Sequence, residues 1–396
     1  MKGIRPSNTY IGLYNITEPL NYSLGSDGVR PNILDRKFQF AIRCIDSDFE
    51  DEYPLSTYEK ISVALRGEIF NLNELAHELE ISDKELRNCN ISSICCRLYL
   101  RYGLDFLCRL NGLFSMILRD EKEDLLVIAV DRYGLAKPVF YNNNGKRLLF
   151  SSHLKTLLGE GTIPREINTQ GLALFLKYAY IPSPLTIIKN THKLGPGERI
   201  ICKGSGIKIE RYVDFKRDQQ ILLESEATHK YEELFSRSLA RRLINIQGEK
   251  AGIFLSGGLD SSANIAFSSQ ISEVPLEAFS VGFEGEKNDE RKYARIVAEH
   301  YGVPFHEYVF TGDEIEDLPQ MLWYLEEPFM ENGLFLTYAG FKSISPEIKT
   351  IITGNCADQL FGTGGFSGGI PIALRYIIDK AHLAQIVRSL QTYCRN

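Results

Sequence analysis

The sequence predicts a two-domain α/β protein, with two stacked antiparallel sheets between helices first and a doubly wound parallel sheet second. Three observations lead to this fold class. Short apolar segments separated by charged or glycine turns fill the first half, as in antiparallel sheets. Strand-like and helical segments alternate in the second half, as in parallel sheets. A strand, a glycine turn and a helix follow one another within residues 251–266, AGIFLSGGLDSSANIA.

Length and charge limit the possible classes of protein. The chain has 396 residues, for which two domains are the natural expectation. Its formal net charge of −6 offers no basic surface, so we expect no nucleic-acid partner. No apolar run approaches the roughly 20 residues of a membrane span, and the N-terminal MKGIRPSNTY lacks the apolar core of a signal peptide. We therefore expect no membrane partner.

Cysteine and histidine spacing bears on metal binding and on location. The eight cysteines are scattered without a CxxC pair, and the seven histidines form no HxxxH pair. This spacing argues against a zinc site. Free thiols are typical of a reducing compartment, so we expect a cytoplasmic location.

In the first half, apolar segments of strand length are bounded by turns. The expected strands cover residues 9–14, 38–45, 61–70, 113–119, 125–130, 138–141 and 148–151. Helical spacing of apolar residues predicts helices over 72–79 and 91–102. Many strands with few helices indicate stacked sheets covered by helices.

The second half has a different rhythm. A charged and polar stretch, 216–225, marks the boundary, so the expected domains are 1–215 and 226–396. The expected strands are 252–255, 276–283, 305–310 and 350–353, and the helices besides the one after the glycine turn are 227–243, 289–301, 315–325 and 334–343. Ligands of parallel sheets lie beyond the carboxyl ends of the strands. Leu255, Phe283 and Thr353 would then face one crevice.

The 251–266 stretch is a candidate phosphate-binding loop. Glycine lets an anion approach the backbone, and free N–H groups at a helix start point at it. The candidate nucleotide-binding residues here are Leu255, Ser256, Gly257, Gly258, Asp260, Ser261 and Ser262. Asp260 would repel phosphates unless it holds a cation such as Mg2+ that bridges to them. The pattern is neither a Walker loop nor a dinucleotide fingerprint. A plain glycine turn with a capping aspartate is the alternative.

These residues also carry a resemblance to known families. SGGLDSS, residues 256–262, is similar to the pyrophosphate loop of the ATP pyrophosphatase superfamily. The first half resembles the glutaminase domain of class B asparagine synthetases in GEIFN at 67–71, GLFSMILRD at 112–120, DRYGLAKPVFY at 131–141 and LLFSSHLKTLL at 148–158. Residues 167–198 resemble that family's bridge to its second domain. The resemblance implies an N-terminal-nucleophile-type αββα sandwich followed by an ATP pyrophosphatase-type domain that uses ATP and Mg2+.

A second motif follows the last expected strand. Residues 353–362, TGNCADQLFG, resemble the family segment Ser-Gly-x-Gly-x-Asp-Glu-Leu-Phe-Gly. The resemblance implies that Asp260 and Asp358 hold Mg2+, and that Val281, Thr353 and Gly354 contact the nucleotide. A turn or cap residue is the alternative for Asp358. The resemblance also implies that the acidic turn Glu326-Glu327-Pro328 lines the acceptor site.

The glutaminase chemistry of the family does not carry over to this sequence. That chemistry needs a cysteine directly after the initiator Met, with the freed α-amine as its base, and Lys2 stands there instead. The family's upstream arginine motif is missing. Asn90 and Ile91 stand where a Ser/Gly-Asp pair would grip the amine of glutamine. We therefore assign no catalytic residue and expect an inactive glutaminase-like domain.

The second domain also departs from the family pattern. Asn355 replaces an acidic residue used near the acyl-adenylate, and Gln359 replaces the Glu after the magnesium aspartate. The sequence ends at Asn396, soon after the motif, so we expect an ATP-binding domain that is C-terminally short relative to the family: a compact variant, a fragment or a chain that has lost activity. Lys380 is the only lysine after Asp358, where relatives supply a lysine to the phosphates.

The resemblance implies a carbon–nitrogen ligase that activates a carboxylate as an acyl-adenylate and releases AMP and pyrophosphate. Its expected substrates are a small-molecule or peptide carboxylate and an amine or ammonia, and a homodimer is left open as its assembly. Two alternatives remain. One is intramolecular amide closure, as in beta-lactam synthetases and lasso-peptide macrocyclases. The other is a non-catalytic nucleotide-binding homologue.

Overall fold

The computed structural model describes residues 9–15, 33–34, 38–43, 55–86, 89–215, 223–243, 250–283, 285, 289–330, 333–357 and 360. The chain divides into two compact units. The first unit is Met1–Leu234 with Thr311–Phe341, and the second is Phe235–Phe310 with Lys342–Asn396. The division falls inside helix α7 (Glu224–Leu243). The predicted boundary at 216–225 stays a prediction, and each unit is described below by itself.

Two antiparallel sheets form the body of the first unit, each with six strands in the described ranges. The first sheet runs in the order β10 (His192–Lys193), β8 (Phe140–Asn143), β9 (Arg147–Ser151), β1 (Thr9–Asn15), β3 (Phe38–Arg43) and β2 (Ile33–Leu34). The second runs β12 (Gly206–Arg211), β11 (Glu198–Lys203), β7 (Leu125–Val130), β6 (Gly112–Asp120), β5 (Ile61–Ile69) and β4 (Leu55–Tyr58).

The two sheets pack face to face because alternate residues of their strands are apolar. In β7, Leu126, Ile128 and Val130 join a core cluster with Tyr14 of β1 and Phe150 of β9. The side chains between them on β7 belong to a different cluster, which faces helices. A strand buried on both faces reads as a continuous apolar run, and LLVIAV does so.

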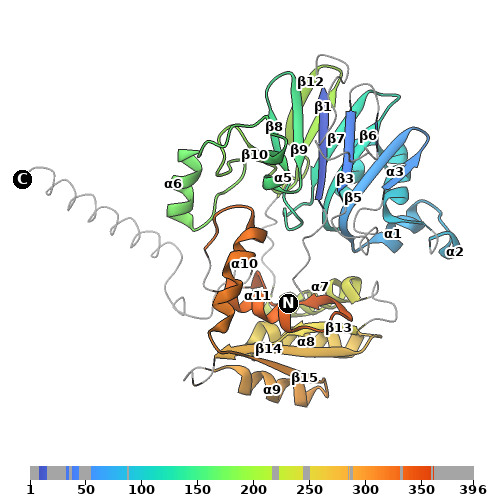
Figure 1. The fold of residues 1–396 in the computed structure, drawn as a ribbon. Helices are drawn as coiled ribbons and strands as arrows, with labels where there is room; N and C mark the ends of the chain where they lie inside the picture. Colours follow the sequence, from blue (N-terminus) through green and yellow to red (C-terminus); the bar gives the residue numbers. More distant parts are fainter. Residues whose placement is uncertain are drawn as a thin grey trace, which may run out of the picture. The chain divides into compact units, whose positions relative to one another are not determined.

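Helices cover the two outer faces. The second sheet shares a core with α1 (Leu72–Glu78), α3 (Ile91–Tyr102) and α4 (Phe106–Arg109), and α3 lies alongside β4 and β5 (Figure 1). On the first sheet, Leu13 and Leu149 contact Leu154 and Leu157 of α5 (Leu154–Gly159). The layers are therefore helix, sheet, sheet and helix, which confirms the predicted αββα sandwich.

Shorter elements complete the first unit. They are α2 (Asp83–Leu86), the 3-10 helix η2 (Gly103–Asp105), α6 (Thr169–Tyr178), the 3-10 helix η3 (Asp313–Asp317), α10 (Leu318–Leu325) and most of α11 (Leu334–Ser343). Asn168 caps α6 by accepting hydrogen bonds from the amides of Gln170 and Gly171. Within the described ranges, no helix combines the length and the apolar character needed to cross a bilayer.

The second unit is built on a sheet that is fully parallel in the described chain, in the order β15 (Phe305–Phe310), β14 (Leu276–Phe283), β13 (Lys250–Phe254) and β16 (Ile348–Ile352). From β13 the chain moves outward to β14 and β15, and later returns to the opposite side of β13 as β16. The sheet is therefore doubly wound, as predicted, with its switch point between β13 and β16.

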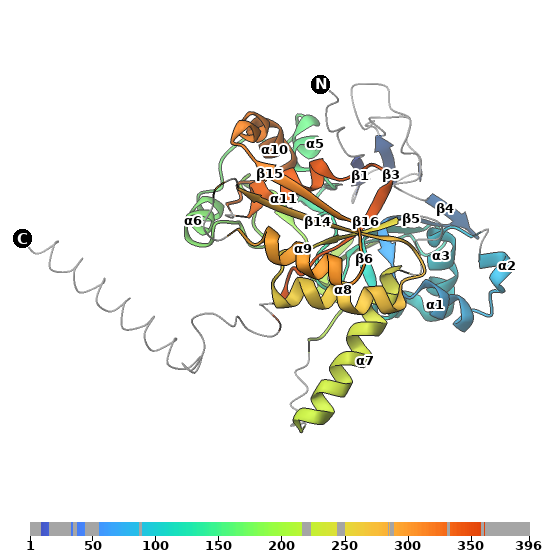
Figure 2. The ribbon, with the colours of Figure 1, turned by 90° about the horizontal axis from the view of Figure 1, so that it is seen from below.

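Helices α8 (Leu259–Ile271) and α9 (Arg291–His300) follow β13 and β14 and lie side by side (Figure 2). Ile265 of α8, Ala294 and Ala298 of α9, and Leu239 of α7 share one core cluster with the strands. The rings of Phe235 and Phe267 meet edge to face at 5.1 Å, which joins α7 to α8.

Most expected elements are present, with ends shifted by one or two residues. Several elements were not expected, among them β4, β11, α5 and α6. Helix α6 lies in the stretch interpreted only as a bridge between domains, and strand β11 begins at the last residue of that stretch. It pairs with β12 across the turn at Gly204, so the sequence ERIICKGSGIKIE did carry a hairpin signal.

We predict that Ile128→Ala lowers the free energy of unfolding by about 2–5 kcal/mol, because Ile128 lies fully buried between the two sheets. Urea unfolding would measure the change. Ile209→Ala is the matched control, since Ile209 on β12 is 42% exposed, and its loss should be about 0.5 kcal/mol or less. Equal losses in the two variants would contradict the assignment of Ile128 to the inter-sheet core.

Candidate active site

The predicted phosphate loop follows the central strand of the parallel sheet. Leu255 is buried, and its amide donates to the carbonyl of Phe279 at 2.8 Å, which extends the β13–β14 pairing by one residue. The chain then turns through residues 256–258 and enters α8. The amides of Leu259, Asp260 and Ser261 occupy the first turn, where a helix offers no carbonyl acceptor. They form an anion-binding end of the helix.

Position 257 of the turn requires glycine. Its φ is +83°, a left-handed conformation that side chains disfavour. A Cβ at this position would lie 2.6 Å from Cβ of Tyr293 and 2.7 Å from the amide nitrogen of Ala294 in α9. Gly258 has φ −72° and meets only Oγ of Ser256, at 3.3 Å. The close approach of the loop to α9 therefore depends on Gly257 alone.

Two serine hydroxyls hold the loop in shape. Oγ of Ser256 lies 3.0 Å from Oγ of Ser261 and accepts from the amide of Gly258 at 3.3 Å. Oγ of Ser261 donates to the carbonyl of Gly258 at 3.2 Å, and the amide of Ser262 donates to that same carbonyl at 3.0 Å. Ser261 is buried and Ser256 is exposed. These bonds hold the loop open as a backbone cradle.

The second predicted segment lies beside this cradle. Gly354 follows β16, and a Cβ placed on it would be 3.5 Å from the amide nitrogen of Ser261 and 3.6 Å from Cβ of Asp260. The loops after β13 and β16 therefore meet at the switch point of the sheet, where open parallel sheets bind ligands. Thr353 precedes Gly354 at this edge. Val281 lies two residues before the end of β14, paired with Tyr308.

Only one of the two predicted metal ligands, Asp260, lies within the described residues. Asp260 is exposed in the first turn of α8, and no described residue bonds its carboxylate. A free carboxylate beside orphan amides suits a cation that bridges to phosphates. Asp358, the predicted second ligand, lies outside the described residues, as do Lys2, Gln359 and Lys380. Among the residues that are described, no three His, Cys, Asp or Glu side chains form a metal-binding group.

An ion pair missed by the sequence analysis lies near the carboxyl end of β14, at the edge of the sheet where the candidate phosphate loop also lies. We call this edge, formed by the carboxyl ends of β13, β14 and β16, the nucleotide edge. Asp289 accepts from Nε of Arg291 at 2.9 Å and from the amide of Arg291 at 3.0 Å. These bonds hold the pKa of the Asp289 carboxyl below its usual value. A Cβ on Gly282 would lie 2.6 Å from Nε of Arg291, so the pair packs directly on β14. The sequence signal was the Asp-Glu-Arg run at 289–291, which the sequence analysis placed only at the start of an expected helix.

In the first unit, a basic group gathers around His153, at the end of β9. Nζ of Lys137 lies 3.2 Å from Nε2 of His153, and Oγ of Ser152 lies 3.0 Å from Nδ1. Burial, followed by the charges of Lys137, Arg66 and Lys155, lowers the pKa of His153 to about 3. The imidazole is therefore neutral at neutral pH. His153 sits on a stretch that resembles the glutaminase domain and Arg66 directly precedes another, but among the described residues they make a basic cluster without a thiol.

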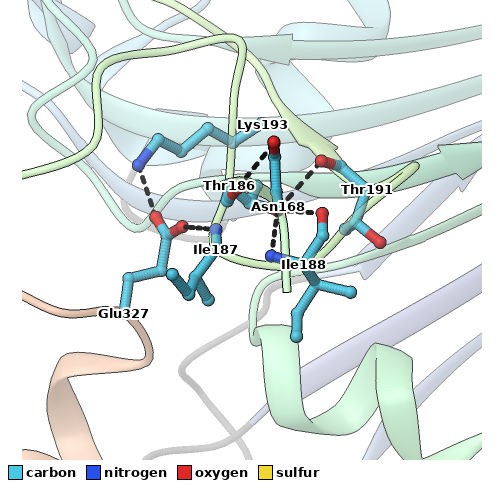
Figure 3. Close-up of polar contacts among 7 residues, drawn as sticks. All are labelled: Asn168, Thr186, Ile187, Ile188, Thr191, Lys193 and Glu327. Atoms are coloured by element: carbon cyan, nitrogen blue, oxygen red, sulfur yellow. Dashed lines mark hydrogen bonds and ion pairs between the residues drawn. The ribbon is translucent and has the colours of Figure 1, made fainter. Parts of the chain in front are cut away.

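The acidic turn Glu326–Pro328 lies in the first unit, and both of its carboxylates contact lysines. Figure 3 shows the contact of Glu327 with Lys193. Glu326 pairs with Lys155 at 2.7 Å, and Glu327 pairs with Lys193. The predicted acceptor role of this turn stays a prediction. The lysine partners were missed because they lie more than a hundred residues away in sequence.

We predict that Gly257→Ala destabilises the second unit by about 1–3 kcal/mol and weakens ATP binding, because the new methyl meets the backbone of α9. Thermal unfolding and nucleotide titration would measure the two effects. Gly258→Ala is the matched control, with an expected cost of about 1 kcal/mol or less. Equal tolerance of both substitutions would contradict the described loop.

We predict that His153 makes the first unit less stable in acid. Its folded pKa of about 3 lies below the value of 6.5 for an unperturbed histidine. Between these values the unfolded chain binds a proton that the folded chain does not, so stability falls as pH drops below 6.5. At about pH 5 the loss attributable to His153 is about 2 kcal/mol. Urea unfolding at neutral and acidic pH should show a smaller loss in His153→Asn; an unchanged loss would refute the assignment.

Comparisons with known proteins agree on one family. The model of the family described as Asparagine synthase matches residues 230–375, and that described as Glutamine amidotransferase domain matches residues 40–213. A Methanocaldococcus jannaschii protein with the provisional name glutamine-hydrolysing asparagine synthetase 2 is 30% identical over 375 residues, covering 90% of this chain and 69% of its own. Glutamine-hydrolysing asparagine synthetase 3 of Bacillus subtilis is 25% identical over 317 residues, covering 76% and 51%.

Among solved structures, a glutamine phosphoribosylpyrophosphate amidotransferase from B. subtilis overlaps 89% of this chain and 90% of its own, at 12% identity and a TM-score of 0.33. A TM-score this low does not establish a shared arrangement of the whole chain. The chain spans about half the length of the Bacillus asparagine synthetase. The two family matches and the archaeal relative carry the conclusion: the chain belongs to the class B asparagine synthetase family of ligases.

Proposed function

We propose that the protein forms an amide bond at the expense of ATP, through an acyl-adenylate, and releases AMP and pyrophosphate without hydrolysing glutamine. The observation that supports this most is the meeting of Gly354 with Asp260 and Ser261 at the switch point of the parallel sheet. Two segments separated by more than ninety residues in sequence there build one backbone cradle with orphan amides and a free carboxylate.

In this proposal, each residue of the cradle has a role. The amides of 259–261 and the backbone at Gly257 and Gly258 hold the phosphates, and Leu255, Val281, Thr353 and Gly354 border the nucleoside. The hydroxyls of Ser256 and Ser261 hold the shape of the loop around the phosphates, and the hydroxyl of Ser262 supplies a further donor. Asp260, together with Asp358, would hold Mg2+, which neutralises the leaving pyrophosphate. A carboxylate oxygen of the substrate attacks the α-phosphorus, and the bond to pyrophosphate breaks. An amine then attacks the acyl carbon, and AMP leaves with the carboxylate oxygen.

The nitrogen source follows from the first unit. Where the family resemblance calls for a cysteine after Met1, the sequence has Lys2. The nucleophile is then ammonia or a substrate amine, and 1–215 is an inactive glutaminase-like domain joined to an ATP-binding domain, 226–396. The described cysteines, including buried Cys95, Cys96 and Cys202, are free, which supports a cytoplasmic location. A homodimer remains compatible with this proposal.

Each of two alternative functions is favoured by one specific observation. Intramolecular amide closure, as in beta-lactam synthetases and lasso-peptide macrocyclases, suits a chain that lacks the nucleophilic cysteine. A nucleotide-binding homologue without catalysis suits the replacements Asn355 and Gln359 in the second motif.

Pyrophosphate release from ATP and Mg2+ tests the proposal, with aspartate plus ammonia and aspartate plus glutamine as the two substrate sets. We expect release with ammonia only. Asp260→Asn should lower the rate at least about a hundredfold, because one metal-binding carboxylate is lost. Glu273→Gln, an exposed carboxylate beyond the other end of α8, is the matched control and should retain activity.

The possible results of this assay distinguish the proposed function from its alternatives. Release with glutamine would overturn the assignment of an inactive glutaminase. ATP binding that needs Asp260 but gives no release with either nitrogen source would favour a different acceptor or a binding-only role. The absence of ATP binding would refute the ligase proposal.

A further inference from the structure

Part of the region matched by the asparagine synthase family folds into the first unit. The chain leaves the parallel sheet at the end of β15, Phe310, and returns to it as β16. Between these strands, residues Thr311–Phe341 belong to the first unit, although the asparagine synthase match runs from 230 to 375. We call residues 311–341 the excursion. Its contacts with the amidotransferase-like part of the chain explain why it stays there.

The first contact is made by Glu326, whose φ is +63°. Its Oε1 lies 2.7 Å from Nζ of Lys155, and its Oε2 accepts from the backbone amide of Lys155 at 3.1 Å. Nζ of Lys155 also donates to the carbonyl of Trp323 at 2.8 Å and lies 4.3 Å from the centre of the Trp323 ring. Lys155 at the start of α5 thereby holds both the end of α10 and the turn that follows it.

The second contact is made by Glu327. Its Oε2 pairs with Nζ of Lys193, and its Oε1 accepts from the amide of Ile187 at 3.0 Å (Figure 3). The side chains of Lys193 and Glu327 are 16% and 9% exposed. Three residues on, the amide of Met330 donates to the carbonyl of Ala179, at the end of α6, at 2.8 Å. Both carboxylate oxygens of Glu327 are therefore used inside the first unit.

The loop that presents Lys193 and Ile187 is itself held in place. Oγ1 of Thr186 donates to the carbonyls of Ile188 and Thr191, at 2.9 Å each, and Nδ2 of Asn168 donates to the carbonyl of Thr186 at 3.0 Å (Figure 3). Thr186 and Thr191 are buried. A donor held by such a network loses little freedom when it meets a carboxylate, so the binding geometry is set in advance.

Burial makes these pairs consequential. Removing one partner of a buried ion pair leaves an uncompensated charge and is strongly destabilising, whereas exposed pairs contribute little. The same unit offers the contrast. Lys189 and Glu166 also form a lysine–glutamate pair, at 3.0 Å, but their side chains are 58% and 59% exposed.

We propose that Lys155 and Lys193 are positioning residues, which hold the excursion through Glu326 and Glu327 so that β15 and β16 end in register at the nucleotide edge. The glutaminase-like unit is thus retained as a scaffold for the ligase segment. The catalytic part of this inference rests on the proposed function, but the structural part does not.

A double-mutant cycle with hydrogen–deuterium exchange tests the inference on the full chain. Lys193→Met, Glu327→Gln and the double variant are compared with Lys189→Met as the matched control. Exchange at Ile187, at 318–330 and at 353–357 should rise about tenfold or more in each single variant, and the double variant should fall well short of the product of the two. Lys193→Arg, which keeps the charge, should restore slow exchange, and Lys189→Met should match the natural protein.

The readouts separate the two claims. Unchanged exchange at 318–330 in Lys193→Met would overturn the holding role. Fast exchange at 318–330 with unchanged exchange at 353–357 would overturn the link to the nucleotide edge. In the pyrophosphate assay, we expect Lys193→Met to lower kcat about tenfold while KM for ATP stays within about twofold. A natural protein without activity would count against the proposed function only, because exchange decides the structural claim.

Discussion

The candidate site depends on the parallel pairing of β13 with strands on both of its sides. Because β14 and β16 flank β13, the chain must change direction across the sheet, and the loops after β13 and β16 meet at this switch point. Gly257 then lets the first loop pass against α9, and Gly354 lets the second pass against the first turn of α8. Orphan amides, hydroxyls and the carboxylate of Asp260 converge there without any special side-chain chemistry.

The fold of the first unit does not rest on catalytic side chains. Its stability comes from alternating apolar residues on two sheets and from the helices outside them, and none of these depends on a nucleophile. Among its described residues, Arg66 and Lys137 gather around a neutral His153. Packing and catalysis are thus separable in this domain.

Ion pairs in the first unit join two parts of the sequence that match different families. Lys155 and Lys193 lie on stretches that resemble the family's glutaminase domain and bridge, and their partners lie in the segment matched by the synthase family. A buried carboxylate needs its cation, so the two parts of the sequence are held together by electrostatics as well as by the covalent chain. Under the proposed function, in which glutamine is not hydrolysed, these pairs give a physical reason for the presence of the domain.

The sequence by itself determined the strands and helices with strong periodicity, the two-domain α/β class and the loop at 256–262, because these follow from local pattern and turn chemistry. It missed β4, β11 and α6 among others, although α6 is amphipathic and β11 begins a hairpin; strand partners and packing supply the order there. Only the tertiary structure decided that Gly354 lies beside Asp260, that Lys155 and Lys193 bind Glu326 and Glu327, and that 311–341 belongs to the first unit. Such contacts join residues far apart in the chain. They are set by topology and by burial, and neither leaves a mark on local sequence spacing.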